Sequence, residues 1–345
     1  MFQILDTHTL AGLMRETEPA SNYWRSNFVG GNALYFDSEY IDFDTVDKGR
    51  RLAPFVAPNV AGRAMTEQGY ATRRFKPAYI KPKTVVQPDR VLKRRAGEPY
   101  TGVLSPDQRR NAIVADILQD HKDMIVRRLD WMAAQATITG SVVISGEDYP
   151  EVTIAFGRHN DHTITLSNTD LWSDTTNSNP IKKLEEVCLM VQRRSTSPVN
   201  DLVFGVDAWA AFALHPKVQG ALETKRGSTL TMETATGIGF GSEVAQYKGQ
   251  LPNGPRLWVY NDVYENNSGA DVAILNSKFV VGVGRIEGIR AFGAILDGRA
   301  GYRSLEMFPK MWEENDPAVE TIMTQSAPLM IPRRPNASFR MQVLS

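Results

Sequence analysis

Cysteine is almost absent from this chain of 345 residues, which contains one, Cys188. A single cysteine cannot form an internal disulfide, so the sequence is typical of a protein that folds in a reducing compartment. Because Cys188 lies in the apolar run 187–191, we expect a small buried side chain rather than a reactive thiol. The chain also lacks an apolar run of the roughly 20 residues that span a bilayer, and it opens with no secretory signal. These absences predict a cytoplasmic protein with no membrane partner.

The residues that usually carry catalysis or bind metals are sparse as well. The chain has five histidines, and no zinc-protease, paired-cysteine, nucleophile-elbow or phosphate-loop motif occurs in it. His159 and His162 flank Asp161, but this spacing is a weak metal signal, and solvated loop residues are the better interpretation. The glycine clusters at 237–241 and 282–288 do not follow the dinucleotide-binding pattern, so we interpret both as loops. We therefore predict no enzymatic activity, no cofactor and no metal site.

The chain has no net charge, because 39 basic residues balance 39 acidic ones. A neutral chain argues against a dedicated nucleic-acid binder, yet its charges are unevenly distributed. Ten basic residues and two acidic ones lie between Arg63 and Arg95, whereas acidic residues crowd positions 16–47. We expect the acidic stretch to complement the basic one, in the same or a neighbouring subunit.

The stretch from residue 50 to residue 100 is predicted to contain an extended hairpin. Six prolines interrupt the stretch, and its β-favouring residues are too few to build a core of their own. We place the two arms over residues 50–90 and the tip near Thr66 to Gly69. Ordering such a ribbon costs backbone entropy that it cannot offset alone, so we predict that it rests on another copy of the chain. The weaker alternative is a DNA-binding surface made of the same basic and aromatic side chains. The predicted contact residues are Arg73, Arg74, Phe75, Lys76, Tyr79, Lys81 and Lys83.

The clearest predicted helix runs from Ser105 to Ala136. Ser105 is a candidate N-cap, Pro106 suits the first helical position, and Gln108 completes a capping box. Apolar residues then recur at three- and four-residue spacing up to Gly140, which predicts one buried face on a helix about 48 Å long. The predicted buried face comprises Ile113, Val114, Ile117, Leu118, Met124, Ile125, Leu129, Met132 and Ala136. The predicted solvent-facing charges are Arg109, Arg110, Asp116, Asp120, Asp123, Arg127, Arg128 and Asp130.

Strand and helix patterns in the rest of the chain predict an α+β fold. Period-two runs at 142–144 and 152–156 indicate a strand pair, and a mixed region of helices and strands follows. Strands at 320–326 and 338–344 are expected to return to the first sheet. The predicted division is an arm at 1–49 with a short helix from Thr9 to Arg15, a hairpin at 50–100, a helix with strands at 101–179, an inserted domain at 180–305 and a returning segment at 306–345.

Several short segments, spread over most of the chain, carry a resemblance to a known family. They are Phe55 to Gly62, Phe75 to Lys83, Arg226 to Ser228 with Glu233 to Ala235, Pro309 to Trp312, and Asp316 to Ala318 with Gln325 to Met330. In this order they resemble the major capsid proteins of lambda-like tailed bacteriophages. The resemblance implies the Hong Kong 97 fold, in which an N-terminal arm precedes an extended loop. A long spine helix and a sheet then form a peripheral domain, into which an axial domain is inserted.

The same resemblance implies a structural function. The hairpin would be the extended loop that lies over a neighbouring subunit, and Ser105 to Ala136 would be the spine helix. Copies would form hexamers and pentamers of an icosahedral head shell that encloses double-stranded DNA without sequence specificity. The implied further partners are scaffold and portal proteins, with a decoration protein as an optional one. The implied location is the virion head, after assembly in the host cytoplasm. An encapsulin-like compartment shell of the same fold is the alternative.

Overall fold

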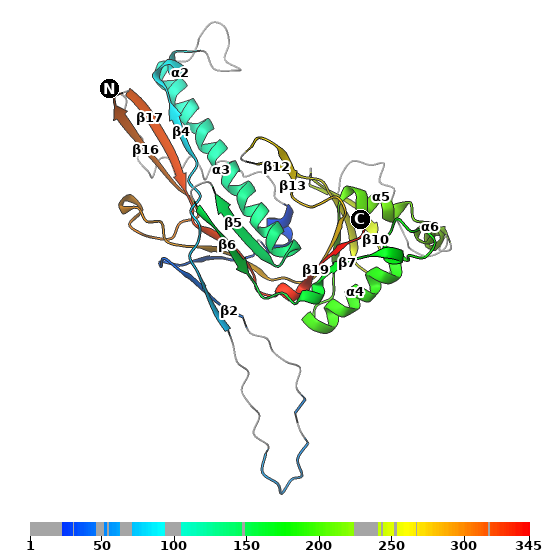
Figure 1. Ribbon diagram of the computed structural model, residues 1–345. Coiled ribbons are helices and arrows are strands. Elements are labelled where there is room, and N and C mark those ends of the chain that lie inside the picture. Colours follow the sequence, from blue (N-terminus) through cyan, green and yellow to red (C-terminus); the bar gives the residue numbers. More distant parts are fainter. Residues whose placement is uncertain are drawn as a thin grey trace.

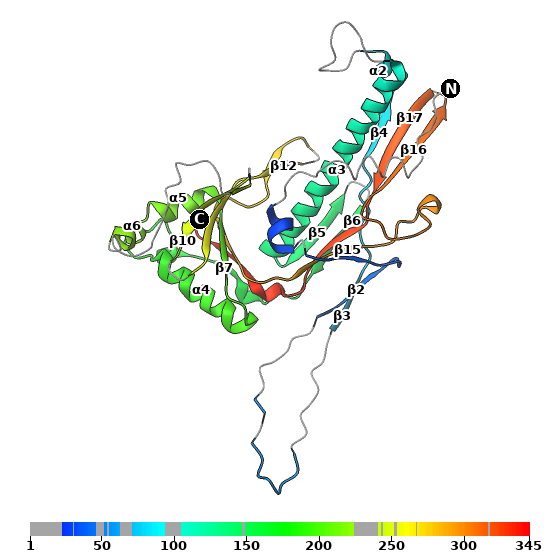
Figure 2. The same cartoon turned by 180° about the vertical axis from the view of Figure 1, so that it is seen from behind.

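The computed structural model describes residues 23–29, 31–45, 52–53, 55–62, 71–93, 105–146, 149–223, 241–242, 244–251, 254–266, 268–316 and 318–345. It shows mixed helix and sheet, which confirms the predicted class in its coarse form. A long helix and a three-stranded sheet form an elongated part, and a seven-stranded sheet with three helices forms a rounder part beside it (Figure 1). A narrow hairpin projects away from both parts (Figure 2). The predicted helix from Thr9 to Arg15 lies outside the described residues.

The long helix α3 runs from Pro106 to Ile138, close to its predicted bounds. Its N-terminus has the expected capping box. The Ser105 hydroxyl accepts a hydrogen bond from the Gln108 backbone N–H at 3.2 Å, and the Gln108 side chain accepts one from the Ser105 N–H at 2.9 Å. At the other end, the Arg158 guanidinium donates to the last two carbonyl groups of α3, at 3.1 and 2.9 Å. Because the last turn of α3 carries no basic residue, Arg158 supplies the cap from outside the helix.

The buried face of α3 rotates along the helix. Ile113, Ile117 and Leu129 are buried as predicted, at 5%, 3% and 0% exposure. Met124 is 60% exposed, so its assignment to the buried face is wrong. The N-terminal half of α3 packs on one sheet, whereas the C-terminal half is also covered by the segment 23–29. The contact face therefore moves away from the side of the helix that carries Met124.

Of the charged residues of α3 that were predicted to face solvent, Arg110 and Asp130 are buried. Arg110 Nε donates to Glu320 Oε1 at 2.6 Å, and the Asp130 carboxylate accepts the backbone N–H of Arg25 at 2.7 Å. Each partner lies more than a hundred residues away in the sequence, so the helical pattern alone misassigned both charges. Burial raises the pKa of Asp130 to about 6.

The N-terminal half of α3 covers a three-stranded antiparallel sheet. Its strands are, in order, β16 (Phe308–Asn315), β17 (Ala318–Gln325) and β4 (Lys83–Val86). Met311 and Ile322 of this sheet pack against the helix. The predicted strand at 320–326 is present as part of β17. It pairs with β16 and β4 and not with the strands at 142–144 and 152–156, so its expected return to the first sheet is wrong. β4 and the short helix α2 (Pro88–Leu92) belong to the body, not to the projecting hairpin.

Two further sheets lie around the C-terminal half of α3. The predicted strand pair is confirmed as β5 (Ser141–Gly146) and β6 (Tyr149–Ala155). The other sheet has the order β1 (Ala33–Tyr35), β15 (Gly288–Phe292) and β18 (Pro328–Pro332). A separate two-stranded hairpin, β12 (Val263–Glu265) with β13 (Asp271–Ala273), rests on α3 through a ring contact between Trp131 and Tyr264.

The rounder part is built on a seven-stranded mixed sheet. Its strands are, in order, β7 (Thr163–Thr165), β19 (Ser338–Gln342), β14 (Phe279–Val283), β8 (Asp201–Phe204), β11 (Arg256–Tyr260), β10 (Ala245–Gln250) and β9 (Gly241–Ser242). The helices of this part are α4 (Pro180–Ser195), α5 (Val206–Ala213) and α6 (Pro216–Glu223). Single short turns are η1 (Arg25–Val29), η2 (Asn160–His162), η3 (Asn168–Asp170), η4 (Gly298–Ala300) and η5 (Pro335–Ala337).

The last strand corrects one prediction. Residues 338–344 were expected to join the first sheet, but β19 lies between β7 and β14 in the rounder part. The reason is a close fit: the Phe339 ring lies directly over Gly282, where even a single Cβ would come within 1.9 Å of it. Gly282 is therefore part of a packed strand and not of the predicted loop.

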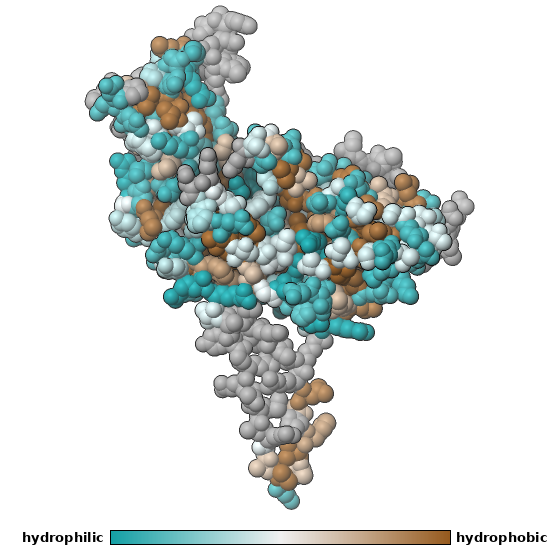
Figure 3. Space-filling view, in the orientation of Figure 1, coloured by the Kyte–Doolittle hydropathy of each residue, from teal (hydrophilic) through white to brown (hydrophobic). Residues whose placement is uncertain are grey.

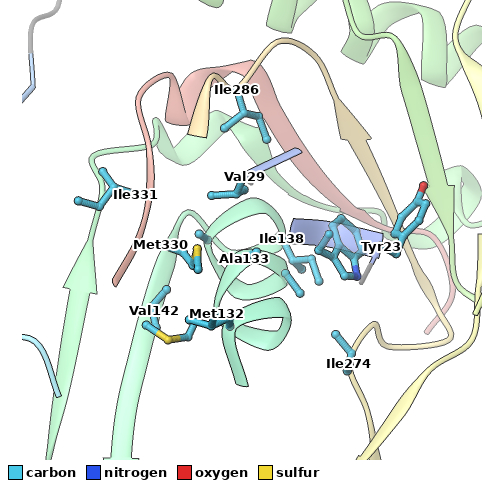
Figure 4. Packing of buried hydrophobic residues seen from close by; sticks show 14 of the residues in the cluster. Tyr23, Val29, Met132, Ala133, Ile138, Val142, Ile274, Ile286, Met330 and Ile331 are labelled. Atoms are coloured by element: carbon cyan, nitrogen blue, oxygen red, sulfur yellow. The ribbon is translucent and has the colours of Figure 1, made fainter. Parts of the chain in front are cut away.

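The segment 23–29 fills the space between α3 and the seven-stranded sheet. Tyr23, Trp24 and Val29 are buried at 3%, 0% and 0% exposure. The rings of Tyr23 and Trp24 lie 5.4 Å from the ring of Tyr260 in β11. Figure 4 shows Tyr23 and Val29 beside Ala133 and Ile138 of α3. We call residues 23–29 the docked segment, because its apolar side chains are buried against its own chain.

Candidate assembly surface

The projecting hairpin begins with a short antiparallel ladder at the body. β2 (Ile41–Thr45) pairs with β3 (Ala71–Phe75), so that Ile41 faces Phe75 and Thr45 faces Ala71. In each of these pairs the midpoint of the two residue numbers is 58, so the middle of the hairpin lies at residue 58. The hydrogen bond from Val60 N–H to the Ala57 carbonyl, at 3.0 Å, forms a turn at that centre. The predicted tip at Thr66 to Gly69 lies outside the described residues, and the register moves the centre of the hairpin to the turn at 57–60.

The described part of the loop, residues 52–53 and 55–62, carries no charged side chain. Its apolar residues Leu52, Phe55, Val56 and Val60 are 93%, 106%, 41% and 62% exposed. Figure 3 shows this apolar surface at the end of the hairpin. We call these four residues the apolar tip. None of the four is among the contact residues predicted from the sequence, although the run from Leu52 to Val60 is mostly apolar.

The acidic stretch meets the basic one at the base of the hairpin, in the same chain. Arg74 donates two hydrogen bonds to Asp42, at 2.8 and 3.0 Å, and Lys76 lies 2.5 Å from Glu39. These contacts hold the pKa of Asp42 below its ordinary value and raise the pKa values of Arg74 and Lys76. The predicted complementarity is therefore confirmed within one subunit.

The other candidate residues of β3 also contact the body. Arg73 donates to the Ala155 carbonyl at 2.5 Å, and Phe75 stacks on Phe43 with ring centroids 5.6 Å apart. The Phe43 ring in turn lies 6.0 Å from Phe156. β3 is thus fixed to the end of the β5–β6 pair.

The last three candidates continue this attachment along the body. Tyr79 donates its hydroxyl hydrogen to the Ala294 carbonyl at 2.6 Å, and burial raises its pKa. Lys81 Nζ lies 4.9 Å from the centre of the Tyr79 ring, and Lys83 Nζ lies 5.6 Å from that of Trp312. Six of the seven predicted contact residues therefore touch other parts of their own subunit, and Lys81 contacts Tyr79. Among the described residues of the hairpin, the apolar tip is the part that stays exposed.

The features that would suggest chemistry have ordinary structural explanations. His162 is buried, and its Nδ1 lies 3.0 Å from the Ser338 carbonyl, while His159 contacts Arg194. Cys188 is a half-buried free thiol, and burial raises its pKa to about 12. Across the described residues, no group of three or more histidine, cysteine or acidic side chains is arranged to hold a metal ion. No described helix is long and apolar enough to cross a membrane.

Known proteins similar to this chain show which family it belongs to. Residues 6–343 match the family described as phage major capsid protein E. The chain belongs to this family. Its members are structural proteins of the phage head, which confirms the resemblance found in the sequence.

Individual capsid proteins of the family are similar over nearly their whole length. The major capsid protein of Escherichia phage lambda is 30% identical over 314 residues, which are 89% of this chain and 90% of that protein. The major capsid protein of Escherichia phage N15 is 30% identical over 302 residues, 86% of each chain. Among solved structures, a crystal structure of a candidate prophage capsid protein from E. coli CFT073 shares the fold, with a TM-score of 0.74 and 22% identity over 98% of this chain and 99% of that one.

Proposed function

We propose that copies of this capsid protein form hexamers and pentamers of an icosahedral shell around double-stranded phage DNA, with each hairpin laid over a neighbouring copy. The observation that carries the proposal is the apolar tip. Burying an exposed leucine or phenylalanine side chain is worth about 1.5–3 kcal/mol, and in an isolated subunit the tip stays in water. A neighbouring copy supplies the missing contact surface in every subunit of a closed shell.

The parts of the molecule then take the places of a Hong Kong 97-like subunit. We assign the chain before β2 to the N-terminal arm, the hairpin from β2 to β3 to the extended loop, and α3 with the sheets at 101–179 and 306–345 to the peripheral domain. We assign the rounder part to the axial domain. Most of it lies within 180–305, β7 and β19 join it from outside these bounds, and β15 lies within them but pairs with β1 and β18. Scaffold and portal proteins, a decoration protein and the packaged DNA are the further partners we infer, with assembly in the host cytoplasm.

The test replaces the apolar tip while leaving its anchors intact. The triple variant Leu52→Ser, Phe55→Ser, Val60→Ser is expected to fold normally, because these side chains are exposed. We expect its yield of shells to fall at least tenfold in sedimentation and electron microscopy. The matched control is Leu214→Ser, which removes an apolar side chain that is 71% exposed at the end of α5.

Normal shell formation by the triple variant would contradict the role given to the tip. The contents of wild-type shells test the second half of the proposal. Nuclease-protected double-stranded DNA is the expected content, whereas shells that hold protein cargo and no nucleic acid would favour the encapsulin-like alternative.

A further inference from the structure

Five exposed arginines gather on one side of the molecule, between the rounder part and the hairpin. They come from the end of α4, the turn between β14 and β15, and the residues before η5: Arg193, Arg194, Arg285, Arg333 and Arg334. The backbone brings these segments together, because Arg334 N–H donates to the Ile286 carbonyl and α4 packs against η5. We call this set the arginine edge.

The arginine edge has more positive charge than its own neighbours neutralise. Arg285 and Arg334 share Glu287, at 3.0 and 3.4 Å, and Arg194 pairs with Asp161 at 2.7 Å. Within the described part of the chain, Arg193 and Arg333 have no carboxylate partner. A clustered excess of guanidinium groups attracts an anionic surface.

A like-charged pair lies on the opposite side of the molecule. In the β12–β13 hairpin, Glu265 and Asp271 face each other directly across the strands, and both are exposed. Like charges in that position destabilise a strand pair. Neither residue forms an ion pair with any residue that the structure describes. A cationic partner from another molecule would remove this repulsion.

The direction of the hairpin links these two surfaces. The arginine edge begins beside the hairpin anchor: Arg73 of β3 contacts Ala155, and His159, four residues further on, contacts Arg194. Figures 1 and 2 show the hairpin, the end of α4 and η5 on the lower side, and β12–β13 on the upper side. If the hairpin reaches a neighbour, that neighbour lies on the side of the arginine edge. In a ring of identical copies, the neighbour then turns its opposite side towards that edge.

From this geometry we propose that the arginine edge of one copy docks against Glu265 and Asp271 of the next copy around each ring of the shell. The inference rests on the proposed function, because it takes the hairpin's direction as the direction of the neighbour. It adds a second contact of different chemistry: the tip supplies apolar burial, and the two charged surfaces fix the order and register of copies. Exposed ion pairs are weak singly, so we expect them to act as a set and to be sensitive to salt.

The test is a charge exchange in the full-length protein. The first variant is Arg193→Glu with Arg333→Glu, chosen because neither arginine has a local carboxylate partner. The second is Glu265→Arg with Asp271→Arg, and the third combines all four changes. Each reversed pair alone is expected to lower shell yield at least tenfold. The fourfold variant, in which the two surfaces are again opposite in charge, is expected to recover to within about threefold of wild type. The control Lys182→Glu reverses an exposed charge at the other end of α4 and is expected to assemble normally.

The outcomes distinguish failure of this docking inference from failure of the proposed function. No loss of yield in either reversed pair, or no recovery in the fourfold variant, would overturn it. Shells of the arginine variant that form normally but no longer protect DNA would also overturn it, in favour of nucleic-acid contact at this edge. Failure of the wild-type chain to form shells would instead refute the proposed function itself.

Discussion

The docked segment and the apolar tip both carry large apolar side chains, but their surroundings are opposite. Residues 23–29 bury Tyr23, Trp24 and Val29 between α3 and the seven-stranded sheet. Residues 52–62 hold Leu52 and Phe55 almost entirely in water. Apolar content therefore does not by itself decide whether a segment stabilises the fold or an assembly. The path of the backbone determines which of the two it stabilises, because the docked segment returns to the core of its own subunit and the hairpin projects away from it.

The largest expected effect is on folding stability, from truncation within the docked segment. Trp24→Ala removes a fully buried indole and should lower the free energy of unfolding by about 3–5 kcal/mol, measured by denaturant titration of the unassembled subunit. Phe55→Ala should leave that free energy nearly unchanged, since the ring is already exposed. Equal losses from both substitutions would mean that the tip is buried in the isolated subunit, which would contradict the difference drawn between the docked segment and the tip.

A smaller effect is expected from the carboxylate that receives the docked segment. The Asp130 carboxyl has a pKa of about 6, chiefly because it is buried, and Asp262 adds to the shift while Arg25 opposes it. The folded state therefore holds a proton between about pH 4 and 6 that the unfolded chain has released. The stabilisation is complete below the unfolded pKa and is lost as the pH rises through 6.

The variant Asp130→Asn isolates this contribution and keeps an oxygen for the Arg25 N–H. From pH 4 to pH 7.5, wild type should lose roughly 2–3 kcal/mol of unfolding free energy relative to the variant. The buried histidines His121, His162 and His215 have lowered pKa values and act in the opposite direction, but they cancel in this comparison. A constant difference across the pH range would show that Asp130 titrates normally.

The smallest effect should come from an apolar residue that is exposed on α3 itself. Met124→Gln is expected to change the free energy of unfolding by less than about 0.5 kcal/mol, because 60% of the residue is in water. Its buried neighbour Ile125, when changed to Ala, should cost about 2–5 kcal/mol. Thermal and denaturant unfolding of the two variants provide the measurement. A large loss from Met124→Gln would restore the predicted buried face of the helix.

Local signals in the sequence predicted local structure well. The capping box at Ser105 and Gln108 and the spacing after it located α3, since these interactions are made within a few residues. Contacts between remote segments escaped prediction. The burial of Arg110 depends on Glu320, and the position of β19 depends on the fit of Phe339 over Gly282. Neither dependence leaves a periodic trace in the sequence.

The assembly surface shows the same division between local and remote contacts. Charge complementarity between the acidic and basic stretches was visible in composition, and Asp42 and Glu39 confirm it. The centre of the hairpin was not, because it is set by the pairing of Ile41 with Phe75 across the whole loop. With the centre predicted at Thr66 to Gly69, Phe55 falls in one arm of the hairpin, whereas the observed pairing places it next to the turn at 57–60.

The chain segments before and after the hairpin belong to two different sheets. One strand leads back to β1, which pairs in parallel with β15, and the other leads on to β4, which pairs with β17. A force applied at the tip is thus shared between β1 and β4. For either strand to detach, its hydrogen bonds to its partner strand would have to break. Because the two attachments lie in separate sheets, a pull on the hairpin is carried by both of them before either strand separates from its partner.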